Sequence, residues 1–514
     1  MPVRAVVIGV DSSTQSAKAV VTDAETGRAL AVGRAAHEVG GVGGARESDP
    51  EGWWSALRDA VARGLSESGV PASVVTGIAV AGQQHGLVVL DRAGRPVRPA
   101  LLWNDTRSAP QAAALTEAFG EASGGSPDGT AYGDGGGGDR AGARAWAVRT
   151  GSAPVAAVTA AKWRWLTECE PESVAAAAAV RLPHDFLTER LCGVAVTDPG
   201  DASGTGWYAT GPGAYDPDVL ELIGLDPGLL PEVAPSGGTR AGTLTASAAD
   251  FLGLPPGIAV AAGTGDNMAA AVGLGLGGAG LLDSPVLSLG TSGTVYAATR
   301  VRPVTPALSG FAATDGTYLP LACTLNCTLA VDRIAELLGL GREAAEAGGE
   351  LVLLPYLDGE RTPDLPGASG TLTGLRHATS RQQILGAAYE GAVVSVLRAL
   401  DEVLAACGLD PARPETAALP LRLIGGGARG RHWVETVRRL SGRPVILPAA
   451  TDPTALGAAA LAAAAVSGAD PVAISGTWAE AGPAPTELPG LERDTGTWDR
   501  VSTAIDRLGS AVRH

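Results

Sequence analysis

The sequence predicts an α/β protein built from at least two domains. Its 514 residues, of which 45% are hydrophobic, can bury large cores, and a single core rarely grows beyond about 250–300 residues. Short apolar runs typical of strands alternate with segments of helical spacing. A strand, a turn rich in Gly, Ser and Thr, and a second strand occur in each half. A Pro/Gly-rich segment separates the halves, which gives predicted domains at residues 1–256 and 257–514.

The individual elements follow from local patterns. The chain opens with a predicted β-hairpin around the polar turn at residues 11–14, because an apolar run stands on each side of it. Residues 120–151 are rich in glycine and bury little apolar surface, so we expect an exposed insertion there. We expect strands at Val6–Val10, Ala19–Val21, Val74–Val80, Ile258–Ala262, Val286–Leu289 and Leu421–Ile424, and helices at Trp53–Leu65, at Met268–Val272 and from about His432.

Composition argues against several classes of protein. The net charge is −16, with a pI of about 4.9 and no basic stripe, so nucleic-acid binding is not expected. The N-terminal apolar run is too short for a signal peptide and ends at Asp11. The apolar stretch Thr454–Val466 is shorter than the roughly 20 residues that span a bilayer. Five scattered cysteines without a CxxC pair indicate core thiols rather than a zinc site, and a cytoplasmic location.

Three turns of small residues are candidate phosphate sites. Asp11 follows a strand, where a carboxylate suits hydrated magnesium but also suits an Asx-turn. Gly290, Thr291 and Gly293 lie in the corresponding turn of the second half, where bare backbone either approaches a phosphate or simply makes a tight turn. The run Gly425–Ala428 between a strand and a helix admits a nucleotide. Neither GxGxxG nor GxxxxGK[ST] is present, which argues against a dinucleotide fold and a P-loop kinase.

Asp266 stands between a predicted strand and an apolar helix. One interpretation is an N-cap, a position that Asp fills well. The other is a general base aimed at a substrate hydroxyl. The positive end of the helix is expected to keep the carboxylate ionised, and a loose phosphoryl-transfer transition state needs only late proton acceptance. The two interpretations are compatible.

Gln84 and His85 lie at the carboxyl end of a predicted strand, where open α/β sheets bind ligands. Amide and imidazole groups offer hydrogen-bond donors and acceptors to a neutral polyol. Trp103 and Asn104 follow another apolar run and would add an apolar wall with polar tips. A histidine and a tryptophan of the core are the alternative interpretation.

Two long, spaced motifs resemble the signatures of the FGGY family of carbohydrate kinases. They run from Thr159 to Leu166 and from Gly370 to Glu390. Patterns of this length are more specific than a short glycine motif, and the resemblance covers nearly the whole chain. The segments most like the xylulokinase group of the family are Gly82–Gly86, Leu102–Asp105, Ser288–Gly293, Leu354–Pro363 and Gly425–Arg429.

The resemblance implies a fold and an activity. The fold is α/β, with two actin-like domains of the ribonuclease-H type that flank a catalytic cleft, the first binding sugar and the second nucleotide. The activity is the phosphorylation of D-xylulose by ATP and Mg²⁺ to D-xylulose 5-phosphate, with release of ADP, in xylose catabolism that feeds the pentose phosphate pathway. The resemblance is also compatible with a homodimer.

The resemblance also assigns roles to individual residues. Asp266 matches the catalytic base, and Asp11 matches an acid that is required for activity and holds magnesium through water. Many members of the xylulokinase group have Met at the position of Gln84. The remaining matches are Gln84, His85 and Asn267 for the sugar, and Thr14, Gly290, Thr291, Gly426, Gly427 and Ala428 for ATP.

Other functions remain open from the sequence. A kinase of the same family for ribulose or gluconate is the nearest alternative, whereas the segment Gly82–Gly86 argues against glycerol. A catalytically silent, actin-like sugar sensor would be expected to lack Asp266 or Asp11, and both are present. The pair Gln84-His85 argues against an actin- or chaperone-type ATPase with a protein partner.

Overall fold

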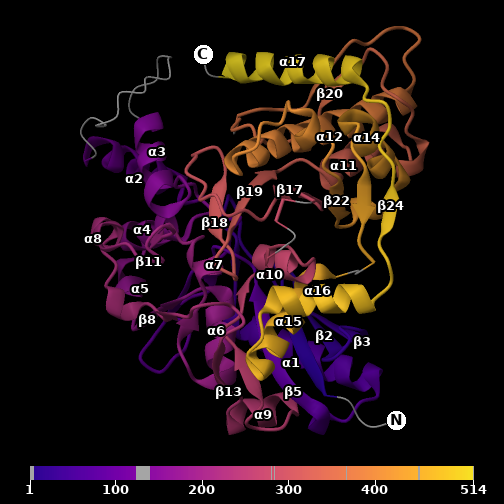
Figure 1. The fold of residues 1–514 in the computed structure, drawn as a ribbon. Helices are drawn as coiled ribbons and strands as arrows, with labels where there is room; N and C mark the ends of the chain where they lie inside the picture. The colour runs from indigo at the N-terminus through magenta and orange to yellow at the C-terminus, as the bar shows by residue number, and fades with distance from the viewer. Residues whose placement is uncertain are drawn as a thin grey trace. The chain divides into compact units, whose positions relative to one another are not determined.

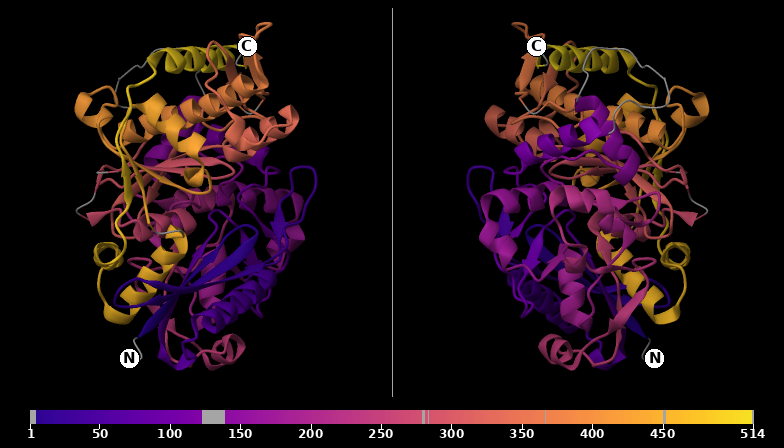
Figure 2. Two further views of the ribbon diagram at one scale, coloured as in Figure 1. Left: turned by 90° about the vertical axis from the view of Figure 1, so that its right-hand side faces the viewer. Right: turned by 90° about the vertical axis from the view of Figure 1, so that its left-hand side faces the viewer.

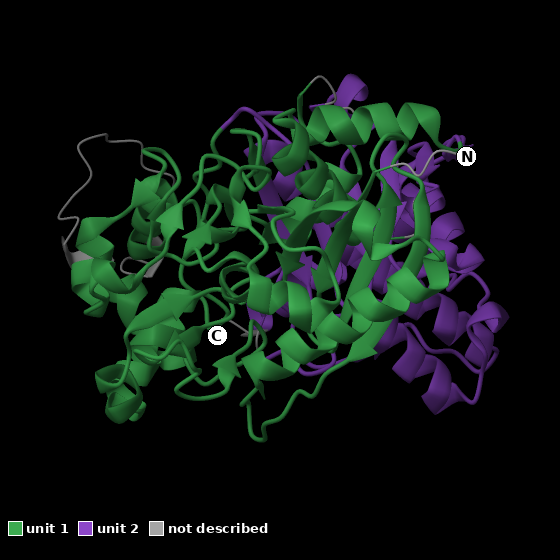
Figure 3. Ribbon diagram, turned by 90° about the horizontal axis from the view of Figure 1, so that it is seen from below, with its two compact units in different colours: residues 1–279, 302–319, 450–483 green, residues 280–301, 320–449, 484–514 purple. Residues whose placement is uncertain are grey.

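The structure of the protein is a computed structural model that describes residues 5–122, 139–278, 281–282, 284–365, 367–449 and 452–512. The chain divides into two compact units, which Figure 3 colours separately. Unit 1 comprises residues 1–279, 302–319 and 450–483, and unit 2 comprises residues 280–301, 320–449 and 484–514. Each unit contains its own mixed sheet with helices packed on it (Figure 1). The prediction of a two-domain α/β protein is therefore confirmed.

The sheet of unit 1 combines antiparallel and parallel strands. In order across it lie β3 (Ala29–Ala36), β2 (Ser16–Asp23), β1 (Val6–Ser12), β5 (Val75–Gly82), β14 (Ala259–Ala261) and β13 (Arg240–Thr243), and β15 (Thr264–Gly265) also pairs with β5. The first three strands are antiparallel to one another, whereas β1, β5 and β14 are parallel. The carboxyl ends of these parallel strands therefore share one edge of the sheet. The predicted hairpin of β1 and β2 is confirmed.

Helices cover both faces of this sheet. Helix α1 (Pro50–Ser68) packs on one face and α15 (Pro453–Ser467) on the other (Figure 2). Both approaches are close, because a side chain at Gly9 would collide with the backbone of α15 and one at Gly33 with the backbone of α1. The strand register places these two glycines on opposite faces. Unit 1 is thus a sandwich of helix, sheet and helix.

The remaining helices of unit 1 include a pair that the sequence did not predict. Helix α3 (Asp139–Thr150) occupies part of the expected insertion, and Trp146 on it is fully buried and donates to the carbonyl of Leu115 on α2 (Ala109–Ala122). The expectation of an exposed insertion is wrong for this helix, because its apolar residues pack on α2; residues 123–138 lie outside the described residues. These helices include α2 (Ala109–Ala122), α3 (Asp139–Thr150), α4 (Thr159–Cys169), α6 (Pro183–Cys192), α7 (Pro199–Ala202), α8 (Pro217–Ile223), α9 (Ala246–Leu252), α10 (Asp266–Gly273) and α16 (Pro471–Ala481).

The division into units departs from the boundary predicted at residues 256 and 257. Both β14 and β15 follow that point, yet they pair with β5 inside unit 1. Helix α10 follows them, and α15 returns near the end of the chain to pack on β1 and β5. The Pro/Gly-rich segment is therefore a tight connection between α9 and β14, within one sheet-containing unit.

Unit 2 repeats the strand arrangement of unit 1. In order across its sheet lie β19 (Tyr318–Thr324), β17 (Gly293–Tyr296), β16 (Val286–Leu289), β22 (Leu421–Ile424), β23 (Val445–Leu447) and β24 (Thr486–Leu488). The first three are antiparallel, and β16, β22 and β23 are parallel. This is the ribonuclease-H-type arrangement that the resemblance implied. Its helices include α11 (Thr328–Leu338), α12 (Arg381–Ala406), α14 (Arg431–Ser441) and α17 (Thr495–Val512).

Two smaller findings concern the apolar segments and the cysteines. Within the described ranges, no single helix is long and apolar enough to cross a membrane, although α15 and α16, bent by 117° relative to each other, pass that test as a pair. Four cysteines are buried thiols, as expected, whereas Cys169 is exposed.

Candidate active site

The carboxyl edge of the unit 1 sheet gathers the predicted catalytic and sugar-binding residues. Asp11 on β1 and Gly265 on β15 lie on either side of the end of β5. Asp266 follows Gly265 directly, and Gln84 and His85 follow β5. Parallel pairing therefore brings together residues that are far apart in the sequence.

Asp266 occupies the first turn of α10, and Gly265 is the N-cap residue. The N-cap prediction is therefore wrong by one position. Oδ1 of Asp266 accepts hydrogen bonds from the backbone N–H of Asn267 at 2.8 Å and from its side-chain amide at 3.0 Å. Within the described part of the chain, no hydrogen bond reaches Oδ2. This oxygen is available to accept a proton.

The surroundings of Asp266 favour its protonated form. Burial, followed by the negative charges of Asp11 and Asp201, raises the pKa of Asp266 to about 7. The direction of this pKa shift is opposite to the one expected from the positive helix end, because burial and two like charges raise the pKa. A carboxylate with a pKa near neutrality is a better proton acceptor than an ordinary aspartate.

Gln84 joins the site through Asn267. The amide nitrogen of Asn267 donates to Oε1 of Gln84 at 2.8 Å and also to Asp266. Gln84 is only 4% exposed, whereas Asn267 and Asp266 are partly exposed. The structure thus places Gln84 behind Asn267, where it fixes the orientation of the amide that contacts Asp266.

His85 is held in an unusual backbone conformation. Its φ is 63°, a left-handed region that side chains seldom adopt without support from their surroundings. Its carbonyl accepts hydrogen bonds from Lys162 at 3.0 Å and from Thr159 at 3.3 Å. Its Nδ1 lies 2.7 Å from the carbonyl of Gly204, so Nδ1 carries the proton. The motif that begins at Thr159 therefore positions the histidine.

Asp11 is the centre of a buried charge network. Its Oδ1 accepts from Ser13 at 2.6 Å and its Oδ2 from Lys18 at 3.0 Å. Lys18 lies directly opposite Asp11 in the hairpin and also contacts Asp452, which precedes α15, at 3.2 Å. Burial raises the pKa of Asp11; burial acts to lower the pKa of Lys18, but the two carboxylates outweigh it and raise that pKa. Sequence reasoning missed Lys18 and Asp452, although lysine is rare in this chain.

The donor set around Asp11 fits a hydrated magnesium ion. Mg²⁺ keeps several waters and is commonly bound by one or two carboxylates together with phosphates. Each oxygen of Asp11 accepts one hydrogen bond and keeps a second lone pair, so contact to the ion through water is compatible with these partners. Among the described residues, no group of three or more His, Cys, Asp or Glu is arranged to hold a metal ion. A dedicated protein cage is therefore not indicated there.

Thr14 lies in the turn of the same hairpin. Its hydroxyl accepts a hydrogen bond from the indole N–H of Trp103 at 3.0 Å. The hydroxyl proton is free to donate to another acceptor, since a threonine oxygen both donates and accepts. Thr14 thus connects the predicted nucleotide contact to the predicted apolar wall of Trp103.

The predicted phosphate turns of unit 2 also share one edge. Gly290 and Thr291 follow β16, and the run that contains Gly426 follows its parallel neighbour β22. A Cβ added at Gly426 would meet nothing within 4 Å. Gly425 instead has a φ of 86° and, like Gly427, lies against Leu289. Ala428 follows in a short 3₁₀ turn. The run therefore has two structural glycines and, at Gly426, exposed backbone.

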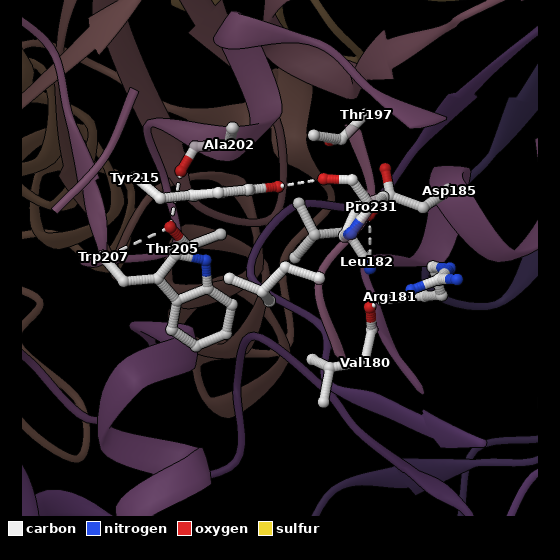
Figure 4. A pocket seen from close by; sticks show the side chains of 11 residues that line it. Val180, Arg181, Leu182, Asp185, Thr197, Ala202, Thr205, Trp207, Tyr215 and Pro231 are labelled. Atoms are coloured by element: carbon white, nitrogen blue, oxygen red, sulfur yellow. Dashed lines mark hydrogen bonds between the residues drawn. The ribbon is translucent and has the colours of Figure 1, made fainter. Parts of the chain in front are cut away.

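A small cavity lies elsewhere in unit 1 (Figure 4). Its volume is about 10 Å³, enough for about one water molecule and no sugar. Asp185 and Thr197 contribute polar atoms to its wall, and Tyr215 donates to the carbonyl of Pro231 beside it. This cavity is not a substrate site.

Comparison with known proteins identifies the family. The N-terminal domain of the FGGY family of carbohydrate kinases matches residues 6–126 and 140–273, and its C-terminal domain matches residues 286–466. The chain belongs to the FGGY family of carbohydrate kinases. In this FGGY kinase the family's N-terminal domain extends through α10, so it contains Asp266, as unit 1 does.

Several relatives of this FGGY kinase align over nearly their full length. The xylulose kinase of Streptomyces coelicolor is 54% identical over 504 residues, which cover 97% of this chain and 95% of that protein. The xylulose kinase of Streptomyces rubiginosus is 53% identical with the same coverage. The crystal structure of xylulose kinase from Bifidobacterium adolescentis is 34% identical, with a TM-score of 0.78 over 98% of this chain and 99% of that one.

Proposed function

We propose that this FGGY kinase transfers the γ-phosphoryl group of ATP to D-xylulose, forming D-xylulose 5-phosphate and ADP. The observation that carries the proposal is the base: Asp266 has a raised pKa and an unoccupied carboxylate oxygen at a strand edge. The 54% identity to a protein named xylulose kinase supports D-xylulose as the substrate. We place the enzyme in the cytoplasm, in xylose catabolism that feeds the pentose phosphate pathway.

In the proposed reaction, unit 1 holds and activates the sugar. The side chains of His85 and Asn267 each contact a sugar hydroxyl. The terminal hydroxyl lies at Oδ2 of Asp266 and passes its proton to that oxygen as the bond to phosphorus forms. Gln84 orients the side-chain amide of Asn267, which in turn hydrogen-bonds to Asp266. Because phosphoryl transfer needs mainly positioning and charge stabilisation, these contacts are the protein's main task.

Unit 2 is proposed to hold ATP. The turn at Gly290 and Thr291, in which the N–H of Gly290 donates to the carbonyl of Ser292, would face the phosphate oxygens, and Gly426, Gly427 and Ala428 would lie against the nucleoside. The exposed backbone at Gly426 supports this role, because no side chain stands in front of it. A magnesium ion held through water by Asp11, with Thr14 nearby in the hairpin, would neutralise phosphate charge.

A substrate panel tests the assignment. ADP release is measured with D-xylulose, D-ribulose, L-ribulose, gluconate and glycerol, with an enzyme-free blank for each. The expected result is the highest kcat/KM for D-xylulose. A clearly higher value for another substrate would reassign the sugar but keep the kinase chemistry, and ADP release with none of them would contradict the kinase proposal. Turnover that survives chelation of divalent ions would remove magnesium from it.

A further inference from the structure

A group of charged side chains without a role in the proposed reaction lies fully buried in unit 1. His184 on α6 is 0% exposed. Its Nδ1 lies 2.7 Å from Oδ2 of Asp201 on α7, and its Nε2 lies 3.2 Å from Oδ1 of Asp185. Asp198, which precedes α7, approaches the same Nε2 at 3.9 Å. The imidazole hydrogen-bonds Asp201 and, among the described residues, lies close to the other two carboxylates without a hydrogen bond from Nε2; we call these four residues the His184 cluster.

The His184 cluster touches the two residues that precede Asp266. Oδ2 of Asp198 accepts a hydrogen bond from the hydroxyl of Thr264 at 2.8 Å. Oδ1 of Asp201 would lie 3.0 Å from a Cβ at Gly265, so this oxygen is directed at the start of α10. Within the described residues, Oδ1 of Asp201 is buried without a hydrogen-bond partner. A fixed, uncompensated oxygen thus stands beside the backbone that carries the base.

Burial of a carboxylate with an oxygen that lacks a hydrogen-bond partner is costly in free energy, unless other groups stabilise its charge. His184 stabilises the charge of Asp201, because its Nδ1 donates a hydrogen bond to the other oxygen of that carboxylate. Burial alone lowers the pKa of His184, but the three carboxylates outweigh burial and raise that pKa to about 9. His184 is therefore a cation near neutral pH. It partly neutralises Asp201 and leaves one oxygen of that carboxylate facing Gly265.

We propose that the pair His184–Asp201 positions and tunes the base, by fixing a carboxylate beside Gly265 that sets the pH at which Asp266 accepts a proton. Asp201 is a positioning residue here, since it acts through Asp266 and touches no substrate. Among the described residues, the other charge that acts on Asp266 is Asp11, which pairs with Lys18, and Lys18 in turn contacts Asp452. The inference rests on the proposed function, because it assigns Asp201 a task in the same reaction.

Two matched substitutions test this role. Asp201→Asn keeps the shape and removes the charge that faces Asp266, whereas Asp185→Asn removes a charge from the same cluster on the side of the cavity in Figure 4. The readout is the pH profile of kcat/KM for D-xylulose. The acid limb is the part of this profile in which activity falls as the pH is lowered. Asp201→Asn is expected to move the acid limb to lower pH by about one unit, with KM nearly unchanged. Asp185→Asn is expected to leave the limb in place.

Comparison of these two variants cancels the contribution of Asp11 and of any metal ion that it holds, because both variants retain it. An unshifted profile in Asp201→Asn would overturn the inference. Equal shifts in both variants would overturn it too, because they would mean a general effect of cluster charge. Kinase activity in the wild type keeps this outcome distinct from failure of the proposed function, which would show as absence of turnover in every variant.

A second pair of variants keeps the test decisive if Asp201→Asn fails to fold. His184→Gln removes the cation and leaves Asp201 uncompensated, so the acid limb is expected to move to higher pH. His184→Lys retains a cation, and the limb is expected to stay close to its wild-type position. A loss of stability alone would lower activity in both His184 variants and would not move the limb in His184→Gln alone. An acid limb that moves to lower pH in His184→Gln would contradict the inference.

Discussion

The carboxyl edges of the two sheets share their strand order but differ in chemistry. In unit 1 the edge carries buried charges: Asp11 paired with Lys18, and Asp266 with a pKa of about 7. In unit 2 the matching turns after β16 and β22 carry Gly290, whose backbone is hydrogen-bonded to Ser292 and Thr328, and Gly426, where an added Cβ would meet nothing within 4 Å. The same arrangement of strands therefore presents acids and amides in one unit and bare backbone in the other.

The difference follows from what each edge is proposed to bind. A neutral sugar hydroxyl needs a base, and burial among like charges turns an aspartate into one near neutral pH. A polyphosphate is already anionic, so carboxylates around it would repel it, whereas backbone N–H groups bind it without added charge. Function in this fold is thus set by the turn residues and not by the sheet.

Removal of the base gives the largest expected effect. Asp266→Asn retains the shape and the hydrogen bonds to Asn267 but cannot accept the hydroxyl proton. We expect kcat to fall by about 10²- to 10⁴-fold, the usual contribution of general-base catalysis. ADP release with saturating D-xylulose measures it. Near-normal turnover would remove Asp266 from this role.

The same variant also tests how the stability of the protein depends on pH. The folded-state pKa of Asp266 lies above its ordinary value of 3.8, so the group stabilises the protein below about pH 4 and this contribution is lost as pH rises through about 7. At pH 8 Asp266→Asn should therefore be more stable than wild type, by on the order of 1–3 kcal/mol after allowance for partial exposure. At pH 5 most of the difference should disappear. Thermal unfolding at both values checks it, and a variant that is less stable at pH 8 would contradict it.

The glycine run of unit 2 gives the next largest effect. Gly426 has ordinary helical backbone angles and open space around it, so Gly426→Val should fold normally and block the nucleotide. We expect the KM for ATP to rise by about tenfold or more, or ~1.4 kcal/mol, with the KM for D-xylulose unchanged. Gly425→Ala is the contrast: its positive φ and contact with Leu289 predict a loss of stability of about 1–3 kcal/mol. An unchanged KM for ATP in Gly426→Val would show that this turn does not contact the nucleotide.

Features governed by local sequence were predictable in both units. The hairpin around Asp11, the strand that leads to Gln84 and the strand before the glycine run all lie where apolar runs predicted them. Placement of Asp266 next to a helix start was also predictable, to within one residue. Each of these depends on neighbours close in the chain, for which periodicity and turn chemistry are sufficient.

Features that depend on distant contacts were not predictable from the sequence. Lys18 meets Asp452 only because α15 returns to pack on β1 near the end of the chain. The raised pKa of Asp266 depends on Asp11 and Asp201, which come from different elements. A helix start considered alone suggested the opposite shift. Burial of Trp146 likewise depends on how α3 packs on α2.

The smallest expected effect separates a support residue from a sugar contact. Gln84→Met is similar in size and removes the acceptor for the amide of Asn267. Loss of one hydrogen bond costs about 0.5–1.5 kcal/mol, so kcat/KM for D-xylulose should fall by about 2- to 10-fold. Gln84→Glu, which keeps an acceptor oxygen, should retain the contact but add a negative charge near Asp266 and move the acid limb to higher pH.

Gln83→Met is the matched control for this substitution. Gln83 is 1% exposed, and within the described residues its amide atoms have no hydrogen-bond partner. Its replacement by an apolar side chain should leave kinetics unchanged and should not lower stability, since an unsatisfied buried amide is costly. If Gln83→Met and Gln84→Met reduced kcat/KM equally, packing around the end of β5 would explain both effects. The hydrogen bonds from Asn267 to Gln84 and to Asp266 would then have no specific role in positioning the base. A defect confined to Gln84→Met would instead show that the amide behind the site, although not exposed to the ligand, sets the geometry of the base.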